Sequence, residues 1–202
     1  MNLKRLSGLL VAGCAGVALA GCATEEKKSA NPAPAASAAP AASAAPAAAT
    51  AASEFYVVLP EDGRYYAFGD TKNYFAFVAH KEVPLTRTRI GVGPNGKTVV
   101  FGITGDDVKK NQPSRAEQVF DGKLPSAPQF YGEVYKDGRY YVFDELKALK
   151  DFAAFGEVPY SFTDIGAGPK GETLVWVMNK DSIKKGRPAA RMENFKKLRA
   201  AK

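Results

Sequence analysis

The sequence predicts an α+β protein made of two tandem β-β-α-β-β repeats, antiparallel sheets each with one helix, packed as a pseudo-two-fold duplicated domain. Three observations predict this class. The chain repeats itself at a fixed offset, short aromatic segments alternate with tight turns, and each copy contains one apolar stripe of helical spacing.

The repeat is visible as identical residues. An offset of 75 residues aligns 55–114 with 130–189 without a gap, and 26 of these 60 pairs are identical. The longest matches are Asp-Gly-Arg-Tyr-Tyr, which begins at Asp62 and Asp137, and Ile-Gly-x-Gly-Pro-x-Gly-x-Thr. Because self-similarity at a fixed period marks a duplicated structural unit, we expect two copies of one module.

Local patterns predict the first half of each copy. Residues 55–59 and 64–68 are expected strands on either side of an Asp-Gly pair, which favours a tight hairpin turn. Tyr74, Phe77 and Val78 then follow with the i, i+3, i+4 spacing of a helix. The first copy therefore begins with a hairpin and continues into a helix.

Caps and two further strands complete each copy. Asp70 or Thr71 is expected to cap the first helix, and Asp144 the second. Strands are expected near 85–91 and 98–103, and the later one has apolar residues on both faces, which is typical of a central strand. A unit of this size buries relatively little surface and is only marginally stable alone, so we expect the copies to pack face to face.

Aromatic residues along the second strand are candidates for a binding surface. Alternation places Tyr66 and Phe68 on one face of the strand and Tyr65 on the other. If one face is core, Tyr65 and its counterpart Tyr140 could form an aromatic platform for a sugar or a partner. The preference of tyrosine for strands explains these residues equally well.

The N-terminus has the three parts of a secretory signal. Two basic residues precede an apolar run over 6–20, and small residues lead to Cys22. The run is shorter than the roughly 20 apolar residues that a membrane-spanning helix needs. Leu19-Ala20-Gly21-Cys22 resembles the bacterial lipobox. This resemblance implies cleavage before Cys22 and lipidation of its sulfur. Ala23, rather than Asp, follows the cysteine, which resembles the pattern of lipoproteins that are sorted to the outer membrane and face the periplasm.

Residues 29–53 are dominated by alanine, with prolines that interrupt any long helix, and such tracts act as extended spacers. The expected organisation is a signal peptide at 1–21, a lipidated N-terminus and spacer at 22–53, the first repeat at 54–118, a linker at 119–129, the second repeat at 130–189 and a basic tail at 190–202.

Few residues are available for catalysis or metal binding. Cys14 and Cys22 are the only cysteines, so the chain after the anchor has no thiol for a disulfide, a zinc site or thiol catalysis. His80 is the only histidine, which excludes a histidine-based triad, and its counterpart Phe155 indicates a packing position. We expect no metal, no cofactor and no enzymatic activity. The alternative is a glycan-acting hydrolase that uses carboxylates at the repeat junction.

Residues 91–98 match the P-loop pattern G-x-x-x-x-G-K-[ST]. The segment leads into an expected strand, whereas a P-loop leads into a helix, and the second copy carries Glu172 in place of Lys97. The glycines are typical of a turn that needs positive φ. We therefore expect a hairpin turn and no nucleotide partner.

Positive charge is concentrated at the C-terminus. Residues 180–202 contain nine Lys/Arg and two acidic residues, whereas 53–179 contain 15 basic and 17 acidic residues. Met192, Phe195 and Leu198 recur at three-residue spacing, which favours either a helix docked on the domain or a basic amphipathic segment on an anionic surface. The candidate contacts are Lys184, Lys185, Arg187, Arg191, Lys196, Lys197 and Arg199.

The sequence therefore predicts a lipid-anchored lipoprotein of the bacterial cell envelope, of non-enzymatic binding or scaffolding type. The expected partners are the membrane, through the lipid on Cys22, and the cell wall, an anionic lipid or another envelope protein. Nucleic acid is not expected, because an exported domain lies in another compartment.

Overall fold

The computed structural model describes residues 51–200, and all elements below lie in this part of the chain. The strands are β1 (Ala52–Leu59), β2 (Tyr65–Phe68), β3 (Thr86–Arg89), β4 (Val99–Gly102), β5 (Ser126–Lys136), β6 (Arg139–Phe143), β7 (Tyr160–Asp164) and β8 (Thr173–Met178). The helices are α1 (Thr71–His80), α2 (Gly105–Lys109), α3 (Arg115–Phe120), α4 (Leu146–Phe155) and α5 (Ala189–Ala200), with 3₁₀ turns η1 (Pro94–Gly96) and η2 (Ile183–Lys185). The predicted signal peptide, Cys22 and the spacer up to residue 50 lie outside the described residues.

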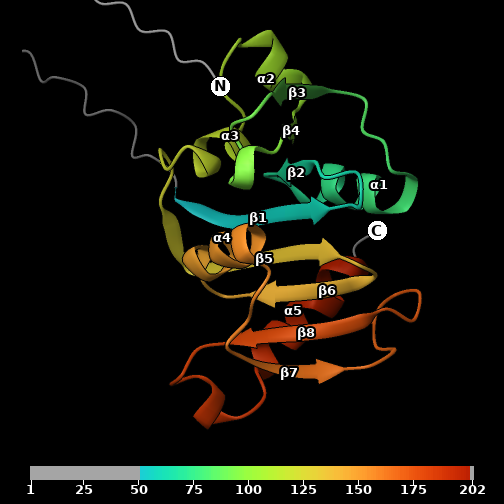
Figure 1. Cartoon of the computed structure of the whole chain (residues 1–202), viewed down its shortest axis with the longest axis vertical. Helices are drawn as coiled ribbons and strands as arrows, with labels where there is room; N and C mark the ends of the chain where they lie inside the picture. Colours follow the sequence, from blue (N-terminus) through green and yellow to red (C-terminus); the bar gives the residue numbers. More distant parts are fainter. Residues whose placement is uncertain (1–50, 201–202) are drawn as a thin grey trace, which may run out of the picture. The chain divides into compact units, whose positions relative to one another are not determined.

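The strands form one mixed sheet in the order β3-β4-β2-β1-β5-β6-β8-β7 (Figure 1). β1 and β5 pair in parallel at its centre, with Tyr56 opposite Glu133. β2 with β4 and β6 with β8 are also parallel, and the remaining neighbours are antiparallel. The α+β class is confirmed. Separate antiparallel sheets packed face to face are not observed, because the two sets of strands join edge to edge through β1 and β5.

The tight turns agree with their sequences. Gly63 has φ +77° and Asp62 accepts a hydrogen bond from the backbone of Arg64 at 2.9 Å. In the β5–β6 turn both Asp137 and Gly138 have positive φ, which matches the twist of a two-residue hairpin. The predicted Asp-Gly hairpins are confirmed.

The helix caps agree in part. The Asp70 side chain accepts a hydrogen bond from the backbone of Asn73 at 2.8 Å, so the predicted cap of α1 is confirmed. The predicted cap of α4 is wrong, because Glu145 occupies the N-cap position without a side-chain hydrogen bond. The Asp144 carboxylate is instead paired with Arg191.

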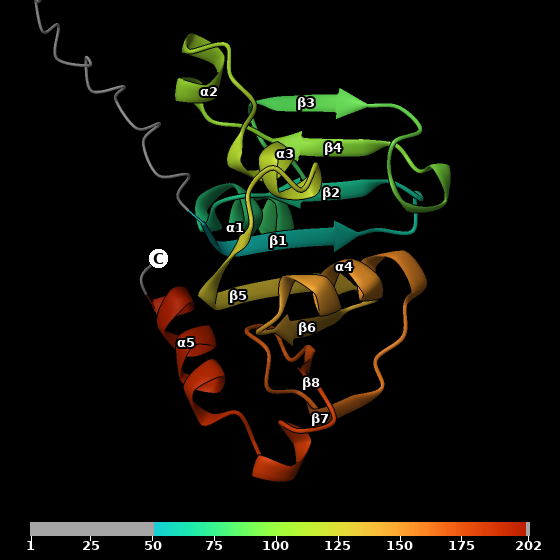
Figure 2. The same ribbon diagram turned by 90° about the vertical axis from the view of Figure 1, so that its left-hand side faces the viewer.

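Helices cover both faces of the sheet (Figure 2). α3 and α4 pack on one face, and α1 and α5 pack on the other. The largest side chain in either cluster, Trp176, is 1% exposed and packs under α5. Burial of such a side chain contributes roughly 1.5–3 kcal/mol, so both faces of the sheet are stabilising core. Of the two alternatives for the basic C-terminal segment, the docked helix is therefore confirmed, since α5 begins at Ala189 and buries Phe195.

Candidate functional site

The centre of the sheet contains a buried carboxylate. Glu133 on β5 is 0% exposed and accepts hydrogen bonds from Tyr131 at 2.5 Å and Tyr74 at 2.9 Å. Arg199 on α5 donates to both carboxylate oxygens, at 2.9 and 2.7 Å. Because β1 carries Tyr56 opposite Glu133, this cluster lies where the two sets of strands join.

The protonation states in this cluster reinforce one another. Burial and the charge of Glu133 raise the pKa of Tyr131 and of Tyr74, so both phenols stay protonated and donate to the carboxylate. Burial disfavours the charged form of Arg199, but its hydrogen bonds and the charge of Glu133 outweigh this, and the pKa of Arg199 is raised. The result is a closed ion pair with its hydrogen bonds satisfied.

Aromatic rings enclose the cation of this pair. The Arg199 guanidinium carbon lies 3.4 Å from the ring centroid of Phe195, 4.8 Å from that of Tyr140 and 5.1 Å from that of Phe75. Cation–π contacts are strongest where the cation is desolvated. The site therefore fixes α5 to the sheet and to α1, and it places no free base or nucleophile in a cleft.

A second arginine fixes the N-terminal part of α5. Arg191 is 8% exposed and donates to the carbonyls of Val142 on β6 and Val177 on β8, at 3.0 and 2.5 Å. Its other terminal nitrogen lies 2.8 Å from Asp144. Burial lowers the pKa of Arg191 and Asp144 opposes this shift. Arg191 thus satisfies the carbonyl of Val142, the last β6 residue paired with β8, and that of Val177, which follows its partner Trp176.

The first half of the chain contains a third buried charge cluster. Glu117 on α3 is 1% exposed and contacts Arg87 at 2.5 Å and Arg89 at 2.8 Å, both on the edge strand β3. It also accepts a hydrogen bond from the backbone of Ser114 in a capping box. Burial alone would raise the pKa of Glu117, but the bonds from Ser114 and Arg89 and the charge of Arg87 lower it.

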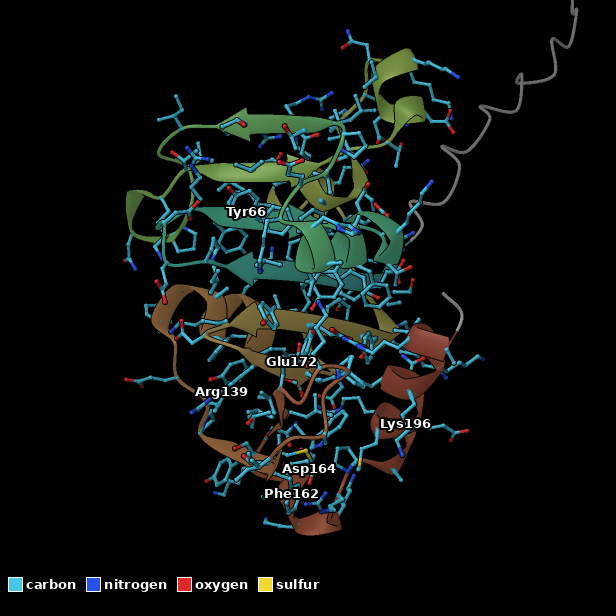
Figure 3. All side chains as sticks on the ribbon, turned by 90° about the vertical axis from the view of Figure 1, so that its right-hand side faces the viewer. Tyr66, Arg139, Phe162, Asp164, Glu172 and Lys196 are labelled. Carbon is cyan, nitrogen blue, oxygen red and sulfur yellow. The ribbon has the colours of Figure 1, made fainter. Side chains whose placement is uncertain are left out.

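The predicted anionic-surface residues divide by type. The arginines form internal pairs: Arg187 with Asp164, Arg191 with Asp144 and Arg199 with Glu133. The lysines are exposed and include Lys196 on α5 (Figure 3). The prediction of surface contact is wrong for Arg191 and Arg199, because their side chains are largely buried in ion pairs within the domain. The remaining exposed lysines of this set are Lys184, Lys185, Lys196 and Lys197.

The predicted aromatic platform is wrong. Tyr65 and Tyr140 are 2% and 4% exposed, because helices cover the sheet face on which each lies. Tyr65 packs against Phe120 on one face and Tyr140 against Phe195 on the other. The alternation of Tyr65 with Tyr66 is confirmed, but each face is core.

Two further predictions have clear outcomes. Residues 91–98 form the turn between the antiparallel strands β3 and β4, so the predicted hairpin turn is confirmed. His80 is exposed and its counterpart Phe155 is 78% exposed, so the predicted packing role of this position is wrong. Both residues are the last of their helices, α1 and α4, and lie at the surface.

Sequence reasoning missed Glu133 and Glu117, the anchors of two buried clusters. One signal was present for Glu133: the residue 75 positions earlier is Val58, so a carboxylate replaces an apolar residue inside a matched strand. Within residues 51–200, no three His, Cys, Asp or Glu side chains are grouped as metal ligands. In the same range, no helix is long and apolar enough to span a membrane.

Comparison with protein-family models, curated proteins and solved structures finds no match for this chain. The functional argument therefore depends on the residues themselves.

Proposed function

We propose that this chain is a lipid-anchored lipoprotein of the bacterial cell envelope that acts as a non-enzymatic binding or scaffolding unit, presented on its Ala/Pro-rich spacer. The observation that carries the proposal is the N-terminal signal ending in Leu19-Ala20-Gly21-Cys22. The lipid on Cys22 would hold the domain at the membrane. Ala23 after the cysteine favours the outer membrane, on its periplasmic side.

The described domain is proposed to be a tandem duplication. The orders β1-β2-α1-β3-β4 and β5-β6-α4-β7-β8 are the same, and their pairings repeat in the same pattern. The matched residues Tyr65 and Tyr140 lie on opposite faces of the continuous sheet, and so do α1 and α4. A pseudo-two-fold axis along the parallel β1–β5 pair accounts for this exchange of faces.

The hydrolase alternative has less support. A glycoside hydrolase needs two carboxyl groups facing a substrate cleft, one of them free to exchange protons. The junction carboxylate Glu133 is fully buried and bonded to Arg199, Tyr74 and Tyr131. If purified protein released soluble fragments from cell-wall sacculi and Glu133→Gln abolished this release, the alternative would replace our proposal.

The anchor is tested with the two cysteines. Cys22→Ser should abolish lipid attachment, measured by mass spectrometry of the membrane fraction, because the thioether needs the sulfur. Cys14→Ser is the matched control, since Cys14 lies inside the apolar run and should leave lipidation intact. Lipid on the Cys22→Ser protein, or an unmodified wild-type N-terminus, would contradict the anchor.

The surface that faces the envelope is proposed to include the exposed lysines 184, 185, 196 and 197. Their replacement by glutamine should weaken co-sedimentation with anionic phospholipid vesicles, and added salt should weaken wild-type binding. The control carries the same four-charge loss at Lys72, Lys109, Lys110 and Lys170, which are also exposed. Equal weakening by both variants would indicate net charge alone, and no wild-type binding would remove this contact from the proposal.

A further inference from the structure

The two outer edges of the sheet differ in chemistry. β3 reads Thr-Arg-Thr-Arg and β7 reads Tyr-Ser-Phe-Thr-Asp. Each strand pairs on one side only, β3 with β4 and β7 with β8. Among the described residues, no backbone hydrogen bond reaches the outer side of either strand from another element. Both strands therefore present backbone donors and acceptors to solvent.

Charge protects only one of these edges. Antiparallel pairing of β3 with β3 of a second molecule about Thr88 would bring Arg87 opposite Arg89 of the other copy, and like charges directly opposite are destabilising. Proteins commonly place charged residues on edge strands to prevent such pairing. Glu117 and Asp121 pair with these arginines, so like charge disfavours this association of β3 without blocking it.

β7 has no such protection. Residues 160–163 are uncharged, and the only charged residue, Asp164, is neutralised by Arg187 at 2.7 Å. Phe162 also packs under the Arg187 guanidinium, 5.7 Å from its ring centroid. Phe162 and Asp164 lie together on β7 at the end of the sheet (Figure 3). Tyr160 is 41% exposed beside this edge, so apolar surface accompanies the open backbone.

We propose that β7 is a self-association edge, which pairs antiparallel with β7 of a second copy of this chain. A two-fold axis through Phe162 places Ser161 opposite Thr163 of the other copy and Tyr160 opposite Asp164 of the other copy. Hydroxyl residues directly opposite one another are favourable cross-strand pairs, and a phenol can donate to a carboxylate. The same patch serves both molecules, so the association closes as a dimer.

The test gives β7 the pattern that protects β3. Ser161→Lys/Thr163→Lys places lysines opposite lysines in the proposed pairing, and Thr163 is already exposed. Thr86→Lys/Thr88→Lys on β3 is the matched control, with the same added charge on the other edge. The protein is the chain from Ala23 to Lys202, made without the lipid, and its mass is followed by analytical ultracentrifugation over a wide range of concentration.

Wild type and the β3 variant should reach twice the chain mass as concentration rises, whereas the β7 variant should keep the single mass. A circular dichroism spectrum equal to that of wild type shows that the β7 variant is folded. The proposal is overturned by a wild-type chain that stays monomeric at every concentration. It is also overturned by a dimer that the β3 substitutions dissociate as strongly as the β7 substitutions.

Discussion

α3 in the first half and α5 in the second half are both fixed to the sheet by buried charge, but with opposite polarity. α3 carries the carboxylate, Glu117, and the edge strand β3 supplies two arginines. α5 carries the arginines, and Arg199 meets Glu133 at the centre of the sheet. The same structural task is therefore done by an acid on one helix and by bases on the other.

The difference lies in what happens when one partner is lost. Arg87 and Arg89 are 34% and 30% exposed, so without Glu117 they can turn toward water. Glu133 is 0% exposed and Arg199 13% exposed, so neither can be rehydrated without moving α5. We therefore expect position in the sheet, rather than the number of contacts, to set the free-energy cost of breaking each cluster.

The largest effect is expected for Arg199→Leu, which inserts the residue found 75 positions earlier, Leu124. An uncompensated carboxylate would remain in the core, and removal of one partner of a buried pair costs about 3–5 kcal/mol. Chemical denaturation should show this loss in the free energy of unfolding.

A double variant separates the buried charge from the lost packing. Glu133→Gln/Arg199→Leu removes the carboxylate charge but leaves an acceptor for Tyr74 and Tyr131. It should recover part of the stability that Arg199→Leu alone loses. A double variant as unstable as the single one would mean that the packing of Arg199 against its aromatic neighbours dominates.

A smaller effect is expected for Glu117→Gln in the first half. Charge-assisted hydrogen bonds to Arg87 and Arg89 weaken, but both guanidinium groups remain accessible to water, so the loss should be about 1.5–3 kcal/mol. The same denaturation experiment compares it with Arg199→Leu. A loss equal to or greater than that of Arg199→Leu would contradict the role of position in the sheet.

pH offers a second test of the Glu117 cluster. The pKa of Glu117 is lower in the folded state than its ordinary value of 4.5, because the Ser114 and Arg89 bonds and the charge of Arg87 outweigh burial. The ionised carboxylate therefore stabilises the fold above about pH 4.5, and this contribution is lost as pH falls through the folded pKa. Wild type and Glu117→Gln should differ most in stability at neutral pH and converge in acid. A constant difference from pH 7 to strong acid would contradict this linkage.

The sequence predicted what is local and missed what is long-range. Turns and the stripe of α1 follow from neighbouring residues, so they were accessible from the pattern of the chain. The parallel pairing of β1 with β5 was not, although five consecutive buried residues from Phe55 to Leu59 match a strand covered on both faces. Periodicity gives the faces of a strand but not its neighbour, so the predicted platform at Tyr65 depended on a sheet that was assumed to be open on one side.

The smallest effect on the free energy of unfolding should come from substitution of the lysines of α5. Arg191, Lys196, Lys197 and Arg199 contribute equally to the net charge of the C-terminus. Only the arginines enter the core, because a planar guanidinium can satisfy several carbonyl and carboxylate acceptors at once. Lys196→Gln/Lys197→Gln should therefore change the free energy of unfolding by less than about 0.5 kcal/mol. If that double variant destabilised the domain as much as Arg199→Leu, the division of α5 into a core-facing arginine side and a solvent-facing lysine side would be wrong. If it leaves stability intact, as expected, any effect of the same substitutions on vesicle binding belongs to the surface and not to the fold.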